Sequence, residues 1–437
     1  MEQAEFMRNL IVETPSSPGN FAKVAMAIGK LEGDIGDIQT IKIGTLSTIR
    51  DISVQCRNEE HLQTIVEEVN RIGVGIVVHA VTDDVLQAHE GGKIHMKGKM
   101  EIRSLGDLRR VYTPGVANVC EIIKEDPEQA NYFTGIPNTV AIVTDGTAIL
   151  GLGNIGPVAG MPVMEGKAVL LDQFAGISGV PILLGTSDPD EVVNTVKNIY
   201  QGFGGILLED IGSPHCFEIE RRLKEELPIP VMHDDQHGTA VVTLASVISA
   251  CRQAEVKLAD SVIGQIGLGA AGLAISRMLM EYGVKELHGI DRNEVACERL
   301  IEHGGTIADS LEELMANCDI VIATTGVADL IKPEMVRKGQ IILALSNPNA
   351  EIKPDVALKA GAAFAADGRL VNNVLGFPGI FRGALNANAK EITYPMLLAA
   401  ANAIVESTKS RDLVPHPLDP SVHENVAAAV ERVALNK

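Results

Sequence analysis

The stretch SVIGQIGLGAAGLAISRMLMEYGVKELHGID, residues 261–291, decides the fold of the C-terminal half. Its first six residues, SVIGQI, are mostly apolar and predict a buried strand. The glycine motif GLGAAG (267–272) predicts a tight turn, and the apolar residues that follow recur at helical spacing. A second apolar run then ends in Asp291. This order of strand, glycine turn, helix, strand and acid is the fingerprint of a Rossmann domain with a parallel sheet.

Each glycine of the motif has a predicted role in forming a dinucleotide site. Gly267 permits the tight turn, Gly269 lets the backbone approach the pyrophosphate, and Gly272 lets the helix pack closely on the strand. The helix N-terminus would direct backbone amides at the phosphates, where the helix dipole is positive. The residues expected to supply these amides are Leu268, Gly269, Ala270 and Ala271.

The choice of dinucleotide depends on the two residues that end the second strand. Asp291 can accept hydrogen bonds from both ribose hydroxyls and would repel a 2′-phosphate, which favours NAD. Arg292 could stabilise that phosphate, so NADP stays open. The same glycine pattern occurs at 151–156 (GLGNIG), but Pro157 and Pro162 follow it. We expect no long helix to start there, and hence no second dinucleotide site.

Composition bounds the class of protein. A chain of 437 residues is too long for one core and predicts two or three domains. With 46% hydrophobic residues, 22% charged residues and 42 glycines it is typical of a folded α/β protein. A net charge of −20 and the absence of tryptophan argue against nucleic-acid binding. An acidic substrate would therefore need a local cation, because the overall field repels it.

The cysteines and the termini predict a cytoplasmic location. The six cysteines form no CxxC pair, which indicates reduced and mostly buried thiols. The N-terminal MEQAEFMRNL has no signal-peptide pattern, and no run of 18 apolar residues occurs, so we expect neither secretion nor membrane insertion. The cysteines are Cys56, Cys120, Cys216, Cys251, Cys297 and Cys318.

Residues 1–85 predict a ferredoxin-like βαββαβ domain. With the turn Pro18-Gly19-Asn20 before its first helix, this region resembles an ACT domain, a module that senses small metabolites. A module that only adds dimer interface is the alternative. The predicted strands are 9–13, 38–43, 49–56 and 75–81, and the predicted helices are 21–31 and 59–72.

The rest of the chain divides by composition and pattern. Residues 88–100 are rich in Gly, Lys and His without periodicity and predict a linker. We expect a mixed α/β domain that binds substrate and metal at 101–240, the Rossmann domain at 241–385, and C-terminal helices at 386–437.

Two acidic pairs predict a metal site. Glu209 and Asp210 end the apolar run 205–208, and Asp234 and Asp235 follow the apolar run 229–232. Adjacent carboxylates at strand ends are costly unless a cation neutralises them, and oxygen ligands favour Mg²⁺ or Mn²⁺. Each pair alone is weak evidence, because most such pairs are solvated turn residues.

Longer words of sequence around these pairs resemble those of malic enzymes of the smaller bacterial type. The words occur in the order of that family across residues 101–390. They are YTPGVA (112–117), GLGNIGPVAGMPVMEGKAVL (151–170), LLEDI (207–211), HDDQHGTA (233–240), ALSNP (344–348) and NNVLGFPGIFRGAL (372–385).

The resemblance implies a role for each matched residue. Tyr112 matches the general acid of the family, Lys167 its general base, and Asp234 the carboxylate that supports the lysine. The residues that match metal ligands are Glu209, Asp210 and Asp235. The residues that match binders of substrate carboxylate and cofactor are Asn347 and Asn373. One departure is Ala148, which stands where larger malic enzymes carry an arginine that clamps a substrate carboxylate.

The implied reaction is the oxidative decarboxylation of malate. Lys167 would take the C2 hydroxyl proton while hydride passes to the nicotinamide, the metal would polarise the resulting carbonyl, and Tyr112 would protonate C3 after loss of CO₂. In water the side chains of lysine and tyrosine lose their protons near pH ~10. We therefore expect burial and the neighbouring cation to lower the pKa values of both groups.

Two other functions remain open. One is a metal-dependent 2-keto acid decarboxylase or malolactic-type lyase that retains NAD, and the other is a metabolite sensor without catalysis. The expected partners are a small dicarboxylate substrate, a metabolite effector at the ACT-like domain, and further copies of the chain in a homodimer or larger homo-oligomer.

Overall fold

The computed structural model describes residues 6–149, 152–347, 349–369 and 371–436. It divides the chain into two compact units, 1–93 and 94–437. Each unit is described by itself below. Among the helices of the described ranges, none combines the length and apolar composition needed to cross a membrane.

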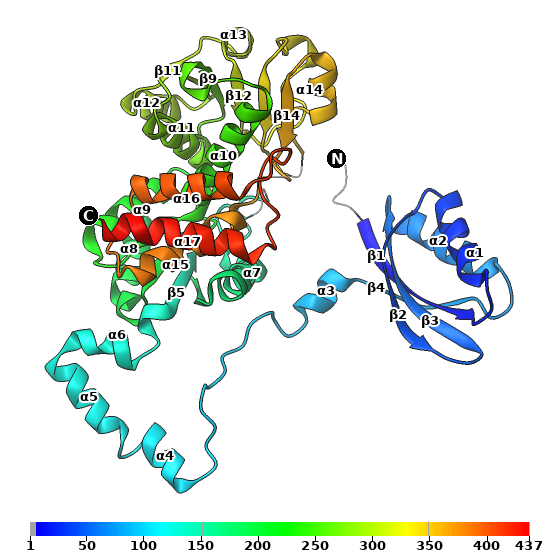
Figure 1. The fold of residues 1–437 in the computed structure, drawn as a ribbon, viewed down its shortest axis with the longest axis horizontal. Coiled ribbons are helices and arrows are strands. Elements are labelled where there is room, and N and C mark those ends of the chain that lie inside the picture. The colour runs from blue at the N-terminus through cyan, green and yellow to red at the C-terminus, as the bar shows by residue number, and fades with distance from the viewer. Residues whose placement is uncertain (1–5, 150–151, 348, 370, 437) are drawn as a thin grey trace. The chain divides into compact units, whose positions relative to one another are not determined.

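The first unit is a four-stranded antiparallel sheet with two helices on one face (Figure 1). Its strand order β2-β3-β1-β4 and its βαββαβ sequence agree with the predicted ferredoxin-like arrangement. Alternate residues of β1, such as Leu10 and Val12, pack against Ile28 of α1 and Ile65 of α2. The elements are β1 Phe6–Pro15, α1 Asn20–Lys30, β2 Asp34–Ile43, β3 Ser47–Cys56, α2 Glu59–Arg71 and β4 Val77–Thr82.

The predicted linker contains part of a short helix, α3 (Asp84–His89). Asp83 caps it by accepting a hydrogen bond from the backbone N–H of Leu86. The division between units falls after Lys93, later than the boundary near residue 85 that the sequence suggested.

The second unit contains two parallel sheets. The first has the order β6-β5-β7-β8, and every strand pair in it is parallel. It lies within the region predicted to bind substrate and metal. Its strands are β5 Thr139–Thr144, β6 Ser178–Leu183, β7 Gly205–Leu208 and β8 Val231–His233, and its helices are α7 Pro157–Ala175, α8 Pro189–Ile199, α9 His215–Glu226 and α10 Asp234–Gln253.

The second sheet has the order β11-β10-β9-β12-β13-β14, again all parallel. This order confirms the predicted Rossmann-type domain. Its strands are β9 Val262–Ile266, β10 Glu286–Ile290, β11 Thr306–Ile307, β12 Ile320–Ala323, β13 Ile341–Ala344 and β14 Phe364–Asp367. Its helices are α11 Ala270–Tyr282, α12 Glu294–Glu302, α13 Leu311–Asn317 and α14 Pro354–Ala360.

The chain returns to the first sheet after the Rossmann strands. Buried residues of the C-terminal helices, such as Phe377, Met396 and Val426, share one hydrophobic core with Leu171 of α7 and Val247 of α10. These helices are α15 Phe377–Asn386, α16 Tyr394–Ser407 and α17 Pro420–Leu435 (Figure 1).

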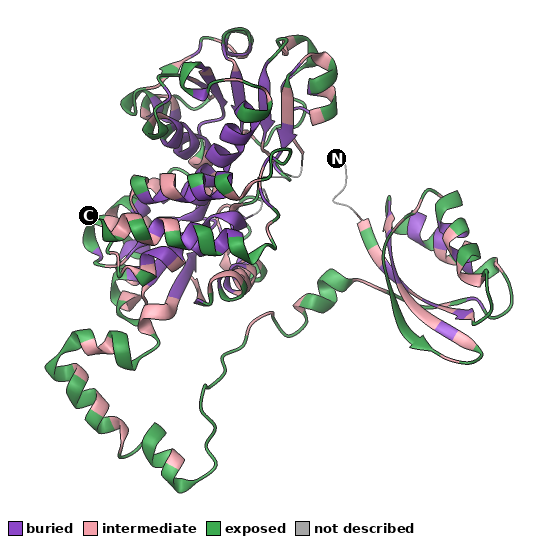
Figure 2. Ribbon diagram, in the orientation of Figure 1, coloured by how far each residue is buried: buried purple, intermediate pink, exposed green. Residues whose placement is uncertain are grey.

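A segment between the first unit and β5 is exposed along most of its length (Figure 2). Its helices α4 (Leu105–Val111), α5 (Val116–Glu125) and α6 (Ala130–Phe133) have no buried residue. Apolar side chains on it, including Leu105 and Phe133, lie exposed to solvent.

One prediction about the second glycine motif is wrong. A helix of 19 residues, α7, begins at Pro157 directly after GLGNIG. Proline is favoured in the first helical turn, where its missing N–H has no intrahelical partner to lose, so Pro157 starts the helix. Gly151 of the motif lies outside the described residues.

Candidate active site

The acidic pairs meet at the carboxyl edge of the first sheet. Glu209 and Asp210 directly follow β7, while Asp234 and Asp235 begin α10 after β8. One carboxylate oxygen from each of Glu209, Asp210 and Asp235 lies within 4.8 Å of the others. Parallel strands bring their ends to the same edge, which is why residues far apart in sequence converge here.

The backbone at this edge is held in an uncommon conformation. Asp210 has a φ of 54°, in the left-handed region that non-glycine residues seldom adopt. Its backbone N–H donates to Asp235 Oδ2 at 3.1 Å, and its carbonyl accepts from the N–H of Ala148 at 3.0 Å. Such strain persists where the surroundings fix it, and it is common at functional sites.

Lys167 projects from α7 into the same cluster. Its ammonium pairs with Asp234, and lies 3.0 Å from Glu209 Oε1 and 4.5 Å from the centre of the Phe377 ring. The residue is only 7% exposed. A buried ammonium is stable only when it is paired. Lys167 is therefore a buried lysine that its carboxylate partners hold in the cluster.

The buried charges shift each other's protonation. Burial alone would lower the pKa of Lys167, but the carboxylates of Asp234 and Glu209 attract the proton and raise that pKa above its usual range. The expected lowering of this pKa by burial together with a neighbouring cation stays a prediction. Burial raises the pKa of Glu209 well above its usual value, and the repulsion of Asp235 adds to that rise while Lys167 opposes it.

The carboxylate cluster fits a hard divalent cation. Buried Glu209 Oε2 has no hydrogen-bond partner, although buried carboxylate oxygens are normally paired. Four carboxylates face a single ammonium here, which leaves an excess of buried negative charge. Among the described residues the group of possible ligands contains three carboxylates and no cysteine or histidine, and such oxygen ligands suit Mg²⁺ or Mn²⁺.

The structure brings one of the two predicted asparagines to this cluster. Asn373, in the short helix η6 (Asn373–Leu375), donates from Nδ2 to Asp234 Oδ2 at 2.6 Å. Asp234 is therefore held by Lys167 and Asn373 together. Asn347 lies exposed after β13, near Gly368 and without a described contact to the cluster.

Tyr112 is not brought to the cluster. It follows α4 in the exposed segment and is itself 65% exposed, with its backbone N–H bonded to the carbonyl of Leu108 at 2.9 Å. The predicted acid and base are thus separated in a single copy of the chain.

The glycine turn has the geometry that the motif predicts. Gly267 has a φ of 89°, and a Cβ on Gly272 would lie 1.9 Å from the carbonyl oxygen of Gly267. A Cβ on Gly269 would meet nothing within 4 Å, so open space lies against the backbone where a pyrophosphate would approach. The residues present therefore fit a dinucleotide.

One amide of this turn has another partner. The N–H of Leu268 donates to Asp291 Oδ2 at 2.6 Å, so in this structure it does not face a phosphate as predicted. Asp291 Oδ1 accepts from the N–H of Asn293 at 2.9 Å, which fixes the carboxylate beside the turn. The amides of Ala270 and Ala271 begin α11, where a helix has no internal acceptors for its first N–H groups.

Sequence reasoning missed two supports of the site. The Phe377 ring faces the Lys167 ammonium, a contact between residues far apart in sequence that no local pattern indicates. Buried Glu220 accepts from the backbone N–H of His233 and from the ring of His237, both at 3.0 Å, and so holds the start of α10. The sequence does contain the polar residues that form this contact: Glu220 and Lys224 lie between the two acidic pairs, and His237 follows the second pair.

Comparison with known proteins places the chain in a family. The model of the malic enzyme N-terminal domain matches residues 92–224, that of the 6-phosphogluconate dehydrogenase NAD binding domain matches 262–363, and that of the malic enzyme NAD binding domain matches 366–436. NAD-dependent malic enzyme 1 of Bacillus subtilis (strain 168) is 66% identical over 429 residues, 98% of either chain. The chain belongs to the malic enzyme family.

Other malic enzymes match over most of their length. NAD-dependent malic enzyme of Geobacillus stearothermophilus is 43% identical, over 95% of this chain and 90% of its own. The crystal structure of an NAD-dependent malic enzyme from Thermotoga maritima has a TM-score of 0.76 at 40% identity, over 80% of this chain and 99% of that one. The malic enzyme from Pyrococcus horikoshii has the same TM-score at 39% identity, over 81% and 90%.

Proposed function

We propose that this malic enzyme family member oxidises malate and decarboxylates it to pyruvate and CO₂, with NAD as hydride acceptor and Mg²⁺ or Mn²⁺ as metal. The observation that carries the proposal is the burial of Lys167 among carboxylates that also form a cation site. A metabolite sensor would need the glycine turn but no buried lysine at a metal site. Catalysis is therefore favoured over sensing.

Lys167 is proposed as the base that takes the proton of the C2 hydroxyl. Asp234 and Asn373 fix the direction of its ammonium, since both Lys167 and Asn373 bond to the same oxygen of Asp234. A divalent cation on Glu209, Asp210 and Asp235 would offset the negative charge that now raises the pKa of Lys167, and so favour the neutral amine. When bound, that cation supplies stabilisation of negative charge on the substrate oxygen.

Position 148 carries alanine, so no arginine is available there to bind the second carboxylate of the substrate. We propose that Asn347 and backbone amides of residues 145–149 replace it, since these residues lie beside the cluster, where the Ala148 N–H donates to the carbonyl of Asp210. The free cysteines, of which Cys56, Cys216, Cys251 and Cys318 are buried, are consistent with a cytoplasmic enzyme.

The direct test follows NADH absorbance with malate and Mn²⁺, and repeats the assay with NADP. We expect NADH formation with equal release of pyruvate and CO₂. One relative, 42% identical, is a bifunctional malic/malolactic enzyme, so lactate is measured as well. Lactate formed without net NADH would identify the malolactic-type lyase instead.

For the metal site, Asp235→Asn is expected to raise the Mn²⁺ concentration needed for half-maximal activity at least about tenfold, because one anionic oxygen ligand is lost. The matched control is Asp260→Asn, at an exposed aspartate that ends the short 3-10 helix η4 (Leu258–Asp260) before β9. A wild-type Mn²⁺ titration for Asp235→Asn would remove Asp235 from the ligand set.

For the cofactor, the wild type is expected to have the higher kcat/KM with NAD. Asp291→Ser should lower the ratio of kcat/KM with NAD to kcat/KM with NADP, because it removes repulsion of the 2′-phosphate. Arg292→Ala should reduce kcat/KM more with NADP than with NAD. Steady-state rates with both cofactors measure this. A wild-type preference for NADP would show that Asp291 does not control selection.

Two further features support assembly and regulation. We propose that the chain forms a homodimer or larger homo-oligomer, because apolar side chains of α4 to α6, such as Leu105 and Phe133, lie exposed and these helices have no buried residue. Packing of this segment, on its own chain or on a second copy, would bring Tyr112 to the cluster. We also propose that the first unit is ACT-like and binds a metabolite near Gly19, whose φ of 88° fits the predicted turn.

A further inference from the structure

A cavity lies beside the first turn of α10, where Gln236 and His237 line it. It has a volume of 790 Å³ and is lined by α9, the start of α10, α11, α12 and the 391–394 segment. No residue of the GLGAAG turn and none of the proposed metal ligands is part of its lining. The volume is that of an ordinary small-molecule site.

Two arginines in this cavity lie over aromatic rings. The Arg277 guanidinium lies 4.5 Å from the centre of the Tyr394 ring, and the Arg299 guanidinium lies 4.7 Å from that of Phe217. The only carboxylate paired with Arg277 in the described chain is Glu281, at the limiting distance of 4.0 Å. Stacking fixes the plane of a guanidinium and leaves its N–H edge available to an acceptor.

The other cations of the wall are already neutralised. Lys224 pairs with Glu220 at 2.8 Å, and Arg221 pairs with Glu225 at 2.8 Å. Arg299 forms no ion pair with a carboxylate of the described residues. The site therefore offers two fixed guanidinium groups, those of Arg277 and Arg299, without close carboxylate partners.

Buried polar atoms of the wall also lack partners. Gln236 Nε2, His237 Nδ1 and Thr393 Oγ1 have no hydrogen-bond partner, although buried polar atoms in folded proteins are nearly always paired. Gln236 and His237 are 5% and 6% exposed. These three atoms are closed off from solvent and lie behind the cavity surface, so the two arginines carry the case for a ligand.

We propose that this cavity binds a small organic dianion, whose acidic oxygens pair with Arg277 and Arg299. Glu302 and Glu391 also line the cavity and disfavour ligands more negative than the two arginines can balance. An apolar part of the wall, which includes Leu273, accommodates the carbon skeleton of the ligand. A dicarboxylate and a phosphate ester share this chemistry.

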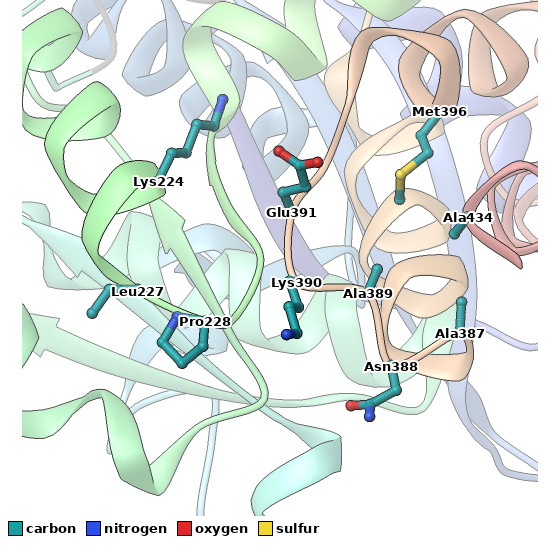
Figure 3. A pocket seen from close by; sticks show the side chains of 10 residues that line it. All are labelled: Lys224, Leu227, Pro228, Ala387, Asn388, Ala389, Lys390, Glu391, Met396 and Ala434. Carbon is teal, nitrogen blue, oxygen red and sulfur yellow. The ribbon is translucent and has the colours of Figure 1, made fainter. Parts of the chain in front are cut away.

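A second hollow, of 450 Å³, shares two residues with the first (Figure 3). Lys224 enters it from α9, and Glu391 enters it from the loop before α16 (Figure 3). No arginine is among the described residues that line it. The ligand is therefore assigned to the 790 Å³ cavity.

The cavity is connected to the candidate metal site. Gln236 and His237 belong to the first turn of α10, which begins with the candidate ligand Asp235 and its neighbour Asp234. Glu220 joins His237 to the backbone of His233 just before that turn. Occupation of the cavity is thus expected to change the affinity for Mn²⁺, which makes the dianion an effector.

The test is calorimetric titration of the full-length enzyme, free of NAD and malate, with succinate and separately with glycerol 3-phosphate. We expect saturable binding of at least one probe that weakens about tenfold or more in Arg277→Gln and in Arg299→Gln, since each variant removes a charge-assisted contact. Arg252→Gln, at an exposed arginine of α10 outside the cavity, is the matched control and should bind as the wild type does.

The outcomes separate the possibilities. Binding of succinate identifies a dicarboxylate site, and binding of glycerol 3-phosphate identifies a phosphate-ester site. Absence of binding by both probes, or binding that neither arginine variant weakens, overturns the proposal. A bound probe should also shift the Mn²⁺ dissociation constant about fivefold or more, and an unchanged constant would overturn the effector role. Malate oxidation without probe should be unchanged in all three variants, so failure of the proposed function is seen separately.

Discussion

Replacing Lys167 with alanine is expected to reduce malate oxidation by about 10² to 10⁴, while NADH still binds with nearly its normal affinity. The amine proposed to take the hydroxyl proton is removed, but the glycine turn that fits the dinucleotide lies on another sheet. Steady-state oxidation rates and NADH fluorescence titration measure the two effects. Malate oxidation at the wild-type rate would show that Lys167 is not the base.

A control is needed to distinguish loss of the catalytic base from loss of stability of the folded protein. Removing Lys167 leaves Asp234 and Glu209 buried without their cation, which is costly in a folded protein. Thermal unfolding with and without Mn²⁺ therefore accompanies the assay, because a divalent ion should offset part of that cost. Lys285→Ala, at an exposed lysine before β10, should behave as the wild type in every measurement.

The Rossmann domain could be predicted because its signal is local. Strand, turn, helix and acid all fall within 261–291, and a Cβ on Gly272 would first meet the carbonyl of Gly267 in the same turn. The close approach of Gly267 to Thr324 is not part of this local pattern. The same locality made the six elements of the first unit predictable to within a few residues. A motif whose residue types are required by local steric contacts can be recognised from the sequence alone.

The helix after GLGNIG was missed because two local rules disagreed. Pro162 lies inside α7 and argues against a helix, whereas Pro157 in the first turn favours one. Packing decided the outcome, since Met164 and Leu171 of α7 enter the core of the second unit and Gly160 leaves room for Ile149. Tertiary contacts of this kind cannot be read from one helix.

The carboxylate cluster was predictable only in part. The ends of β7 and β8 follow from the sequence, because parallel strands finish at one edge. The contact of Asn373 with Asp234 joins residues that are 139 positions apart. The resemblance implied that Asn373 binds substrate or cofactor, and it did not indicate this contact. The raised pKa of Lys167 depends on the balance between burial and two anions, which requires distances.

Replacing Tyr112 with phenylalanine is expected to reduce conversion of malate to pyruvate by about 10² to 10⁴ and to leave much of the reduction of oxaloacetate intact. Only the proposed acid for C3 is removed, whereas hydride transfer does not use it. The two reactions are followed by NADH absorbance in opposite directions. Equal losses in both would contradict this role for Tyr112, and Tyr132→Phe, in the same exposed segment, is the matched control.

A second experiment tests whether the exposed Tyr112 acts at the cluster of its own chain or at that of a second copy. Inactive Tyr112→Phe and Lys167→Ala chains are unfolded together, refolded as a mixture and assayed with malate, NAD and Mn²⁺. If Tyr112 serves a second copy, a mixed assembly contains one site with both wild-type residues, and activity returns to about a quarter of the wild-type value for random dimers. If Tyr112 folds back onto its own chain, every site lacks one residue and the mixture stays inactive.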